Sequence, residues 1–301
     1  MTFEASEIEA VPCHVCGAND PADRPQATAQ LVLPEPLRIV RCRRCGFMYV
    51  SPRLTRAAYA RHSLTESYYQ SYQRGIRPRL GPGTGARAQV ERMQGRHPRP
   101  GRVLEIGCAT GAFLLEARQA GWQVAGVEPS SYMAAAAREQ GLDVAADFVP
   151  ERYGPDAFDV VHMNHVLEHV PDPAATLRGV CQVLAPDGLL IVEVPYEFGG
   201  WFFTLYPILK PGSRRPNIHH LSFFSPRTLA RCLAGAGFAA EVRTRSPKVR
   251  TSGSRWSRWG WTALAFAADP LNRGENIEAF ARRRASGPVA NQIERAVAEH
   301  V

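Results

Sequence analysis

The sequence of 301 residues has no run of eighteen apolar residues, which is about the length that a helix needs to cross a membrane. It also has no internal repeat and no low-complexity segment, which excludes repeat arrays and compositionally biased tails. The first residues, Met-Thr-Phe-Glu-Ala-Ser-Glu, are acidic and lack the apolar core of a secretory signal. We therefore expect a cytoplasmic, globular protein without a membrane span, consistent with 45% hydrophobic and 21% charged residues.

A dinucleotide-binding fingerprint is missing as well. The nearest candidate, residues 103–114, reads Val-Leu-Glu-Ile-Gly-Cys-Ala-Thr-Gly-Ala-Phe-Leu, and Leu114 stands where G-x-G-x-x-G requires a small residue. The spacing is instead E-x-G-x-x-x-G, which favours another adenosine-containing cofactor over NAD. Gly107 and Gly111 allow a sharp turn and the close approach of a ligand. The helix that follows offers free backbone N–H groups to an anion or carboxylate.

From residue 102 onwards, apolar strands alternate with amphipathic helices, a pattern typical of βαβ units and a mostly parallel sheet. The predicted strands are 102–106, 123–127, 142–145, 158–163 and 189–194, with a terminal hairpin of 238–243 and 276–282. The predicted helices are 112–120, 131–140, 173–184 and 225–235.

The chain divides into four predicted parts. Residues 1–55 form a small module with short strands at 31–33 and 38–41 and a third that begins at Phe47 and is ended by Pro52. Residues 56–100 form a helical connector that contributes to the acceptor pocket. Residues 101–285 form the ligand-binding domain, with an insertion at 196–220 and a basic, tryptophan-rich lid at 246–275. Residues 286–301 form a solvated tail.

Four of the seven cysteines form two C-x-x-C pairs, Cys13 with Cys16 and Cys42 with Cys45, separated by about 25 residues. Glycine follows each pair and relieves a tight turn. This spacing predicts a structural Zn²⁺ site of the four-thiolate zinc-ribbon type. The alternative, two disulfides, is disfavoured in a reducing compartment.

Polar residues follow the second and third predicted strands. Glu128, followed by Pro129, stands 17 residues after Gly111, where an acidic side chain can accept both hydroxyls of a ribose. Asp147 and Phe148 follow the third strand, where they could hold the edge and face of an adenine. The alternative for Asp147 is an ordinary turn residue.

Together these residues resemble the class I S-adenosylmethionine-dependent methyltransferases over roughly residues 85–285. The resemblance rests on the segments that begin at Val103, Gly126, Phe158 and Leu184. It implies a doubly wound, Rossmann-like, seven-stranded α/β sheet, with S-adenosylmethionine as methyl donor and S-adenosylhomocysteine as product. The cofactor-binding residues that it implies are Glu105, Gly107, Cys108, Ala109, Gly111, Glu128, Pro129, Asp147, Phe148 and Asn164, the last near the sulfonium.

A four-cysteine ribbon ahead of such a core resembles the sugar C-methyltransferases and related natural-product enzymes. In that family a histidine-bearing segment precedes Phe-Ser and a helix that ends in Gly-Phe, as Ile218-His-His-Leu-Ser-Phe-Phe-Ser does here. The resemblance implies that His220 is a general base, with His219 where the sugar enzymes often carry glutamate. A histidine with a pKa near 6.5 can deprotonate a carbon acid or an alcohol at neutral pH. Tyr72 is a candidate for the acceptor pocket, with a core or linker role as the alternative.

A second constellation competes with the first. His165, Glu168 and His169, expected within about one helical turn, could bind a divalent metal together with His219 or His220. The segment resembles the Glu-x-x-Glu-His of ubiquinone-pathway O-methyltransferases and small-RNA 2′-O-methyltransferases, with His165 in place of the first glutamate. Such a metal would lower the pKa of an acceptor hydroxyl. Without a metal, the helix would place His165 beside the donor.

The favoured hypothesis is a methyltransferase that acts on a small biosynthetic intermediate such as a sugar, nucleotide-sugar or natural product, with C-methylation slightly favoured. Residues 210–215 could clamp a phosphorylated acceptor, or form an exposed solubilising loop. The alternatives are a metal-assisted O-methyltransferase that uses His165, Glu168, His169 and His220, an RNA or protein methyltransferase, and a regulator with a vestigial pocket. The net charge of +8 allows nucleic acid, but the ribbon lacks interleaved basic and aromatic residues, so we expect no nucleic-acid partner. The sequence leaves the oligomeric state open.

Overall fold

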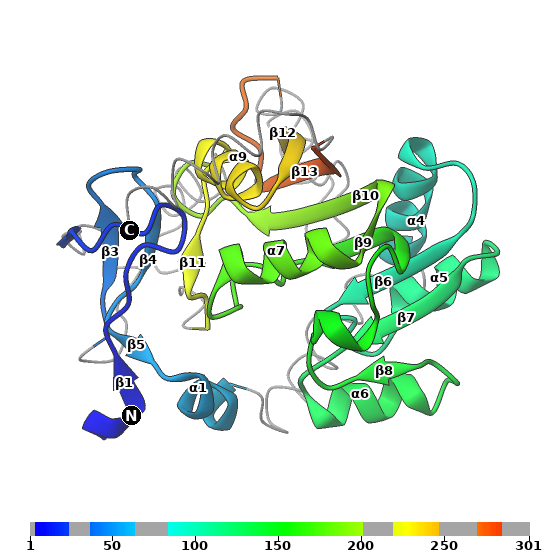
Figure 1. Cartoon of the computed structure of the whole chain (residues 1–301), viewed down its shortest axis with the longest axis horizontal. Coiled ribbons are helices and arrows are strands. Elements are labelled where there is room, and N and C mark those ends of the chain that lie inside the picture. The colour runs from blue at the N-terminus through cyan, green and yellow to red at the C-terminus, as the bar shows by residue number, and fades with distance from the viewer. Residues whose placement is uncertain (1–3, 24–36, 64–83, 201–218, 247–269, 285–301) are drawn as a thin grey trace, which may run out of the picture.

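The chain folds into a mixed seven-stranded sheet with helices on both faces, beside a small N-terminal sheet (Figure 1). The computed structural model describes residues 4–23, 37–63, 84–200, 219–246 and 270–284. The predictions for Tyr72, for residues 31–33, for most of the insertion and the lid, and for the tail lie outside these residues.

The large sheet has the order β12-β13-β10-β9-β6-β7-β8. The five strands β10, β9, β6, β7 and β8 run parallel to one another, and β13 runs antiparallel to its neighbours β10 and β12. The predicted seven-stranded α/β architecture is therefore confirmed. The strands are β6 (Arg102–Ile106), β7 (Gln123–Val127), β8 (Val144–Ala145), β9 (Phe158–Asn164), β10 (Leu184–Pro195), β12 (Phe238–Arg245) and β13 (Asn276–Arg283).

Two strands of the large sheet begin at residues other than the predicted ones. The strand predicted at 142–145 is shorter, because only Val144 and Ala145 pair with β7. The strand predicted at 189–194 begins earlier, since Leu184 pairs with Phe158 before a bulge interrupts the register.

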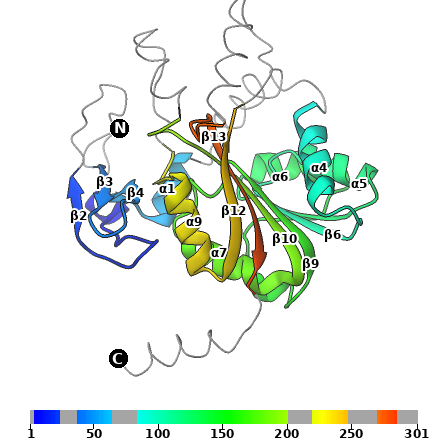
Figure 2. The same ribbon diagram turned by 90° about the horizontal axis from the view of Figure 1, so that it is seen from above.

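Helices cover both faces of this sheet, as Figure 2 shows from above. One face packs against α4 (Thr84–Arg96), α5 (Ala112–Gln119) and α6 (Ser131–Arg138), and the other against α7 (Pro173–Val183) and α9 (Pro226–Gly235). Residues of α7 at helical spacing, among them Leu177 and Val180, are fully buried against the sheet. The side chains of Asp172 and Ser225 cap α7 and α9 by accepting backbone N–H bonds, which sets where each helix begins.

The N-terminal module contains a second sheet with the order β11-β4-β3-β2. Three strands come from the cysteine-bearing region, but β11 (Ser222–Phe223) comes from the chain that follows the insertion. The other elements of this region are η1 (Ala5–Glu7), β1 (Ile8–Glu9), β2 (Pro21–Asp23), β3 (Ile39–Cys42), β4 (Met48–Val50), β5 (Arg53–Leu54) and α1 (Arg56–Ser63). A short helix, η2 (Pro150–Arg152), follows β8. Among the described residues, none of the helices has both the length and the apolar character that a membrane crossing requires.

Candidate active site

The turn after β6 has the left-handed backbone that its small residues suggested. The φ angles of Gly107, Ala109 and Gly111 are 75°, 47° and 83°. Glycine adopts such angles freely, whereas alanine at such an angle is strained by about 1 kcal/mol. A side chain at Gly107 would collide with Val166, because a Cβ there would lie 2.2 Å from its Cγ2. The turn after β6 and the turn after β9 are thus in direct contact.

Glu128 lies at the carboxyl end of β7 and faces this turn. Its side chain is buried, and its two oxygens accept the backbone N–H groups of Ala109 (2.9 Å) and Ser130 (2.8 Å). Burial raises the pKa of Glu128, although the two N–H groups act in the opposite direction. A carboxylate has about four acceptor positions, so each oxygen can accept a further hydroxyl.

Glu105 is buried at the end of β6 and shares a hydrogen bond with the buried His162 of β9 (Oε1 to Nδ1, 3.1 Å). The ring of Phe113 stacks on His162, with ring centroids 4.1 Å apart. The other oxygen of Glu105, Oε2, is buried and has no hydrogen-bond partner among the described residues. Such an unpaired acceptor fits a ligand that brings a donor, such as an ammonium group.

The remaining predicted cofactor residues lie in varied surroundings. Asn164 ends β9 and pairs in register with Glu193. Cys108 is buried, and Pro129 is exposed. Asp147 is exposed and forms an ion pair with Arg56 (2.7 Å). The ring of Phe148 lies beside Tyr153 and against α7, so its side chain is engaged within the fold.

The segment that contains Glu168 forms a turn and not the predicted helix. His165 has a φ of 54°, outside the helical region, and its N–H donates to the carbonyl of Glu193 (2.8 Å). The turn still brings the three side chains together, because Oε1 of Glu168 lies 3.4 Å from Nδ1 of His165 and 3.9 Å from Nε2 of His169.

His220 joins this group from a distant part of the chain. Its ring makes an edge contact with that of His169, with centroids 4.6 Å apart, and its Nδ1 lies 2.9 Å from Oε2 of Glu197. Nδ1 of His169 lies 3.0 Å from the carbonyl oxygen of His219, which holds that nitrogen as an N–H donor. The structure therefore brings His165, His169 and His220 into one cluster, while His219 contributes its backbone carbonyl.

The cluster sets the charge of each histidine. Burial lowers the pKa of His169 to about 4, so this ring is neutral at pH 7. Desolvation lowers the pKa of His165, but the carboxylates of Glu168, Glu193 and Glu275 outweigh it and raise the pKa to about 9. Burial opposes the charged form of His220 too, yet Glu197 raises its pKa above the ordinary value. The cationic form of His165 is accordingly favoured at pH 7, and His220 is hydrogen-bonded to a carboxylate.

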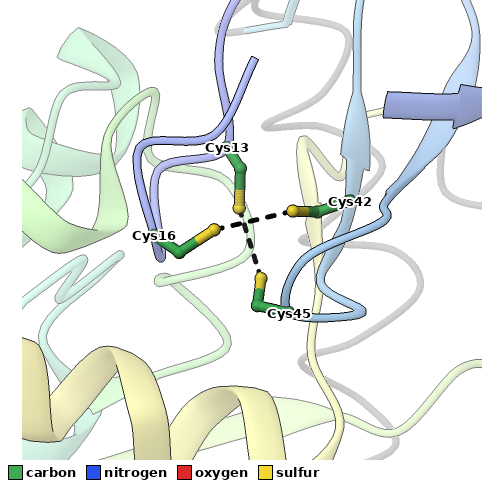
Figure 3. Close-up of side chains that lie close together, drawn as sticks. All are labelled: Cys13, Cys16, Cys42 and Cys45. Atoms are coloured by element: carbon green, nitrogen blue, oxygen red, sulfur yellow. Dashed lines mark hydrogen bonds between the residues drawn. The ribbon is translucent and has the colours of Figure 1, made fainter. Parts of the chain in front are cut away.

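The four cysteines of the predicted ribbon converge on one point (Figure 3). The Sγ atoms of Cys13 and Cys45 are 3.5 Å apart, as are those of Cys16 and Cys42, and all four lie within 4.8 Å of one another. Tetrahedral Zn²⁺ with Zn–S bonds of about 2.3 Å separates its sulfurs by about 3.8 Å, so the donor set fits this ion. Burial raises the pKa of Cys45 to about 11, which a bound cation would reverse. The cysteines are free thiols and not disulfides.

Three residues of the site escaped the sequence analysis: Glu197, His162 and Tyr59. Glu197 stands just beyond the carboxyl end of β10, where open sheets place ligands, and this position was the available signal. Tyr59 of α1 donates its hydroxyl to the carbonyl of His219 (2.9 Å) and also lies 3.3 Å from Nδ1 of His169. No local pattern identifies Tyr59, since its partners are more than a hundred residues away.

The mixed seven-stranded sheet, with its antiparallel β13, the glycine-containing turn after β6 and the carboxylate after β7, is that of the class I methyltransferase fold. The chain belongs to the family described as "Methyltransferase domain", whose model matches residues 76–241.

Two curated relatives illustrate the range of chemistry in this family. The chain is 32% identical over 194 residues to C-methyltransferase NovU of Streptomyces niveus, a match that covers 62% of the chain and 42% of that protein. It is 40% identical over 119 residues to a ubiquinone biosynthesis O-methyltransferase of Caulobacter sp., covering 36% of the chain and 46% of the relative. The chain thus spans less than half the length of either relative.

Solved structures support the same fold. An S-adenosylmethionine-dependent methyltransferase of Thermotoga maritima matches 73% of the chain and 99% of its own, with a TM-score of 0.52 and 21% identity. Phosphoethanolamine N-methyltransferase 2 of Haemonchus contortus matches 79% of the chain and 63% of its own, with a TM-score of 0.54 and 17% identity. At these identities the likeness shows the fold alone.

Proposed function

We propose that this protein transfers a methyl group from S-adenosylmethionine to a small biosynthetic intermediate, and that His220 is the general base. The observation that carries the proposal is the pair of His220 and Glu197, buried next to the turn that follows β9. C-methylation of a carbon beside a carbonyl is favoured, since the relatives include a C-methyltransferase and such a carbon must lose a proton.

The residues around the β6 turn fit the donor. Glu128 offers acceptor positions for the two ribose hydroxyls, and the unpaired Oε2 of Glu105 offers one for the ammonium of the methionine part. When bound, S-adenosylmethionine supplies a methyl group that its sulfonium has already activated. The task of the protein is then to align the acceptor with that methyl group and to remove a proton.

His220 is arranged to take this proton. Its Nδ1–H donates to Oε2 of Glu197, so Nε2 is the ring nitrogen that accepts a proton. Glu197 stabilises the imidazolium that forms, in the way that a carboxylate orients a catalytic histidine elsewhere. The neutral His169 and the ion pair of His165 with Glu168 surround the ring without competing for the proton.

The pH dependence of turnover tests this role. The groups that face His220 are Glu197, Glu168, His165, His169 and His219, and their balance raises its pKa above 6.5. The base must be unprotonated, so turnover should fall as the pH decreases through this raised pKa. In Glu197→Gln the raising charge is lost, and the acid limb of the profile of kcat/KM should move to lower pH while kcat falls. Initial rates from pH 5 to 9 measure both effects, with the exposed Glu151→Gln as control; an unmoved acid limb would contradict the proposal.

A second candidate function is metal-assisted O-methylation. Glu168, His169 and His220 each offer a ligand atom, all within 4.8 Å of one another, and the oxygens of Glu168 accept no hydrogen bond of ordinary geometry from the described residues. Both rings direct Nδ1 to an acceptor, so Nε2 is the nitrogen that would coordinate a metal, as in many metal sites. A divalent cation there would lower the pKa of an acceptor hydroxyl.

Titration with Mn²⁺ distinguishes the two functions. For the metal-assisted reaction, electron paramagnetic resonance on the zinc-loaded protein should detect a tight Mn²⁺ site that His169→Asn abolishes. The control His97→Asn, a half-buried histidine beside Trp122, should retain it. Turnover should then rise with Mn²⁺ or Mg²⁺. If the protein binds no Mn²⁺ and turns over equally without divalent ions, the second candidate is excluded.

A further inference from the structure

The segment that carries His220 belongs to the sheet of the cysteine module and not to the large sheet. Ser222 pairs with Tyr49 and Phe223 with Met48, and the N–H of Val50 donates to the carbonyl of Leu221 (3.0 Å). In Figure 1, β11 lies beside β4. Because β11 begins two residues after His220, the N-terminal module sets the position of this histidine.

The turn that carries Cys45 directly precedes β4, the strand that pairs with β11. β3 ends at Cys42, the turn contains Cys45, and β4 follows, with the N–H of Cys42 donating to the carbonyl of Phe47 (2.9 Å). Phe47 is fully buried, and its ring packs against that of Phe224, with centroids 5.2 Å apart. The metal-binding turn and the histidine segment therefore share one core.

Backbone hydrogen bonds continue this connection into the Glu168 turn. The N–H groups of Leu221 and Ser222 both donate to the carbonyl of Glu168, at 2.8 and 3.0 Å. Tyr59 reaches the carbonyl of His219 from α1, and Nδ1 of His169 approaches the same oxygen. The two histidine-bearing segments are thus joined to each other and to the module.

The loop of the first cysteine pair lies against the residues that follow the same turn. Nδ1 of His14, between Cys13 and Cys16, lies 3.5 Å from Oδ2 of Asp172, the residue that caps α7. The buried guanidinium of Arg53 donates to the carbonyl of Pro171 and pairs with Glu9 (3.0 Å). His14 and Arg53 of the module accordingly contact the two residues that follow the Glu168 turn.

The donor-binding residues depend on the module far less. Glu128 and the turn after β6 are held by bonds within the large domain, to Ala109, Ser130 and Val127. Among the described residues, the module contacts a predicted donor-binding residue through the exposed ion pair of Arg56 with Asp147. Exposed pairs contribute about 0–1 kcal/mol, so the loss of this one has little effect on donor binding.

We propose that the four-cysteine module is a positioning element for the reaction: with Zn²⁺ bound, its sheet holds His220 and the Glu168 turn in place, and without Zn²⁺ the histidines lose their alignment while donor binding persists. This inference rests on the proposed methyl transfer, but its first test needs no acceptor.

The test compares the full-length protein loaded with Zn²⁺ and stripped by a chelator. Hydrogen exchange at residues 165–172 and 219–224 should become faster by about tenfold or more on stripping, since the bonds that join these two segments to each other and to β4 loosen. Exchange at 103–114 and 123–130 should stay the same, and calorimetry should give S-adenosylhomocysteine affinities within about threefold. Unchanged exchange at 219–224 in the stripped protein would overturn the inference. Absence of S-adenosylhomocysteine binding in the zinc-loaded protein would instead overturn the proposed function.

Removal of the Tyr59 hydroxyl tests whether the module aligns the histidines, without unfolding the module. Tyr59→Phe removes the bond to His219 and leaves the cysteines unchanged, so faster exchange at 219–224 is expected, with kcat about tenfold lower and S-adenosylhomocysteine affinity unchanged. Tyr132→Phe, a tyrosine of α6 that is 43% exposed, is the matched control. If Tyr59→Phe has the exchange and kcat of the control, Tyr59 is not a positioning residue and this part of the inference fails.

Discussion

Replacement of His220 by alanine should lower kcat by roughly a hundredfold to ten-thousandfold, the usual contribution of a general base. The expected loss is large because the pair with Glu197 prepares Nε2 to accept a proton, and the neighbouring rings do not replace it. His165 is held protonated by its carboxylates, and burial disfavours a charged His169. Affinity for S-adenosylhomocysteine should change little, since the proposed donor-binding residues Glu105 and Glu128 lie at the ends of β6 and β7, on other segments of the chain.

The measurement is the transfer of labelled methyl groups from S-adenosylmethionine to a panel of nucleotide-linked keto-sugars and phenols, with products identified by mass spectrometry. His97→Ala is the matched control, because the ring of His97 lies beside Trp122 (5.6 Å between centroids), away from the histidine cluster. Calorimetry with S-adenosylhomocysteine accompanies each variant. Wild-type kcat in His220→Ala, or an equal loss of donor affinity, would refute the proposed base.

The parts of this molecule that sequence predicts well are local. The β6 turn, Glu128 and the two cysteine pairs are each recognised within a few residues, because strand, turn and metal-ligand spacings are properties of short segments. The structure gives left-handed angles to Gly107 and Gly111 and draws the four thiols together. These features depend little on how distant strands pair.

The parts that sequence misses depend on distant pairings. His220 meets Glu197 across the insertion, and Tyr59 meets the carbonyl of His219 across 160 positions. Neither contact produces a recognisable spacing or periodic pattern of residues in the sequence. The helix predicted around Glu168 was wrong for a related reason, since a spacing of three or four residues suits a tight turn as well as a helix. The left-handed angle of His165 starts a turn there.

Loss of the Glu128 carboxylate should weaken donor binding by roughly a hundredfold or more. A hydrogen bond to a charged group contributes about 1.5–3 kcal/mol, and Glu128→Ala would remove those offered to the ribose. It would also leave the N–H groups of Ala109 and Ser130 without their acceptor, so the turn itself would lose its support. Glu128→Gln keeps one acceptor oxygen and should give an intermediate affinity.

Calorimetry with S-adenosylhomocysteine measures the series, and thermal unfolding shows whether each variant is folded. The exposed Glu139→Ala, at the end of α6, is the matched control. A graded order of wild type, Gln and Ala would indicate that the carboxylate itself binds the donor. Equal affinities in all three folded proteins would contradict the assignment of Glu128 to the ribose and would shift the donor site away from the end of β7.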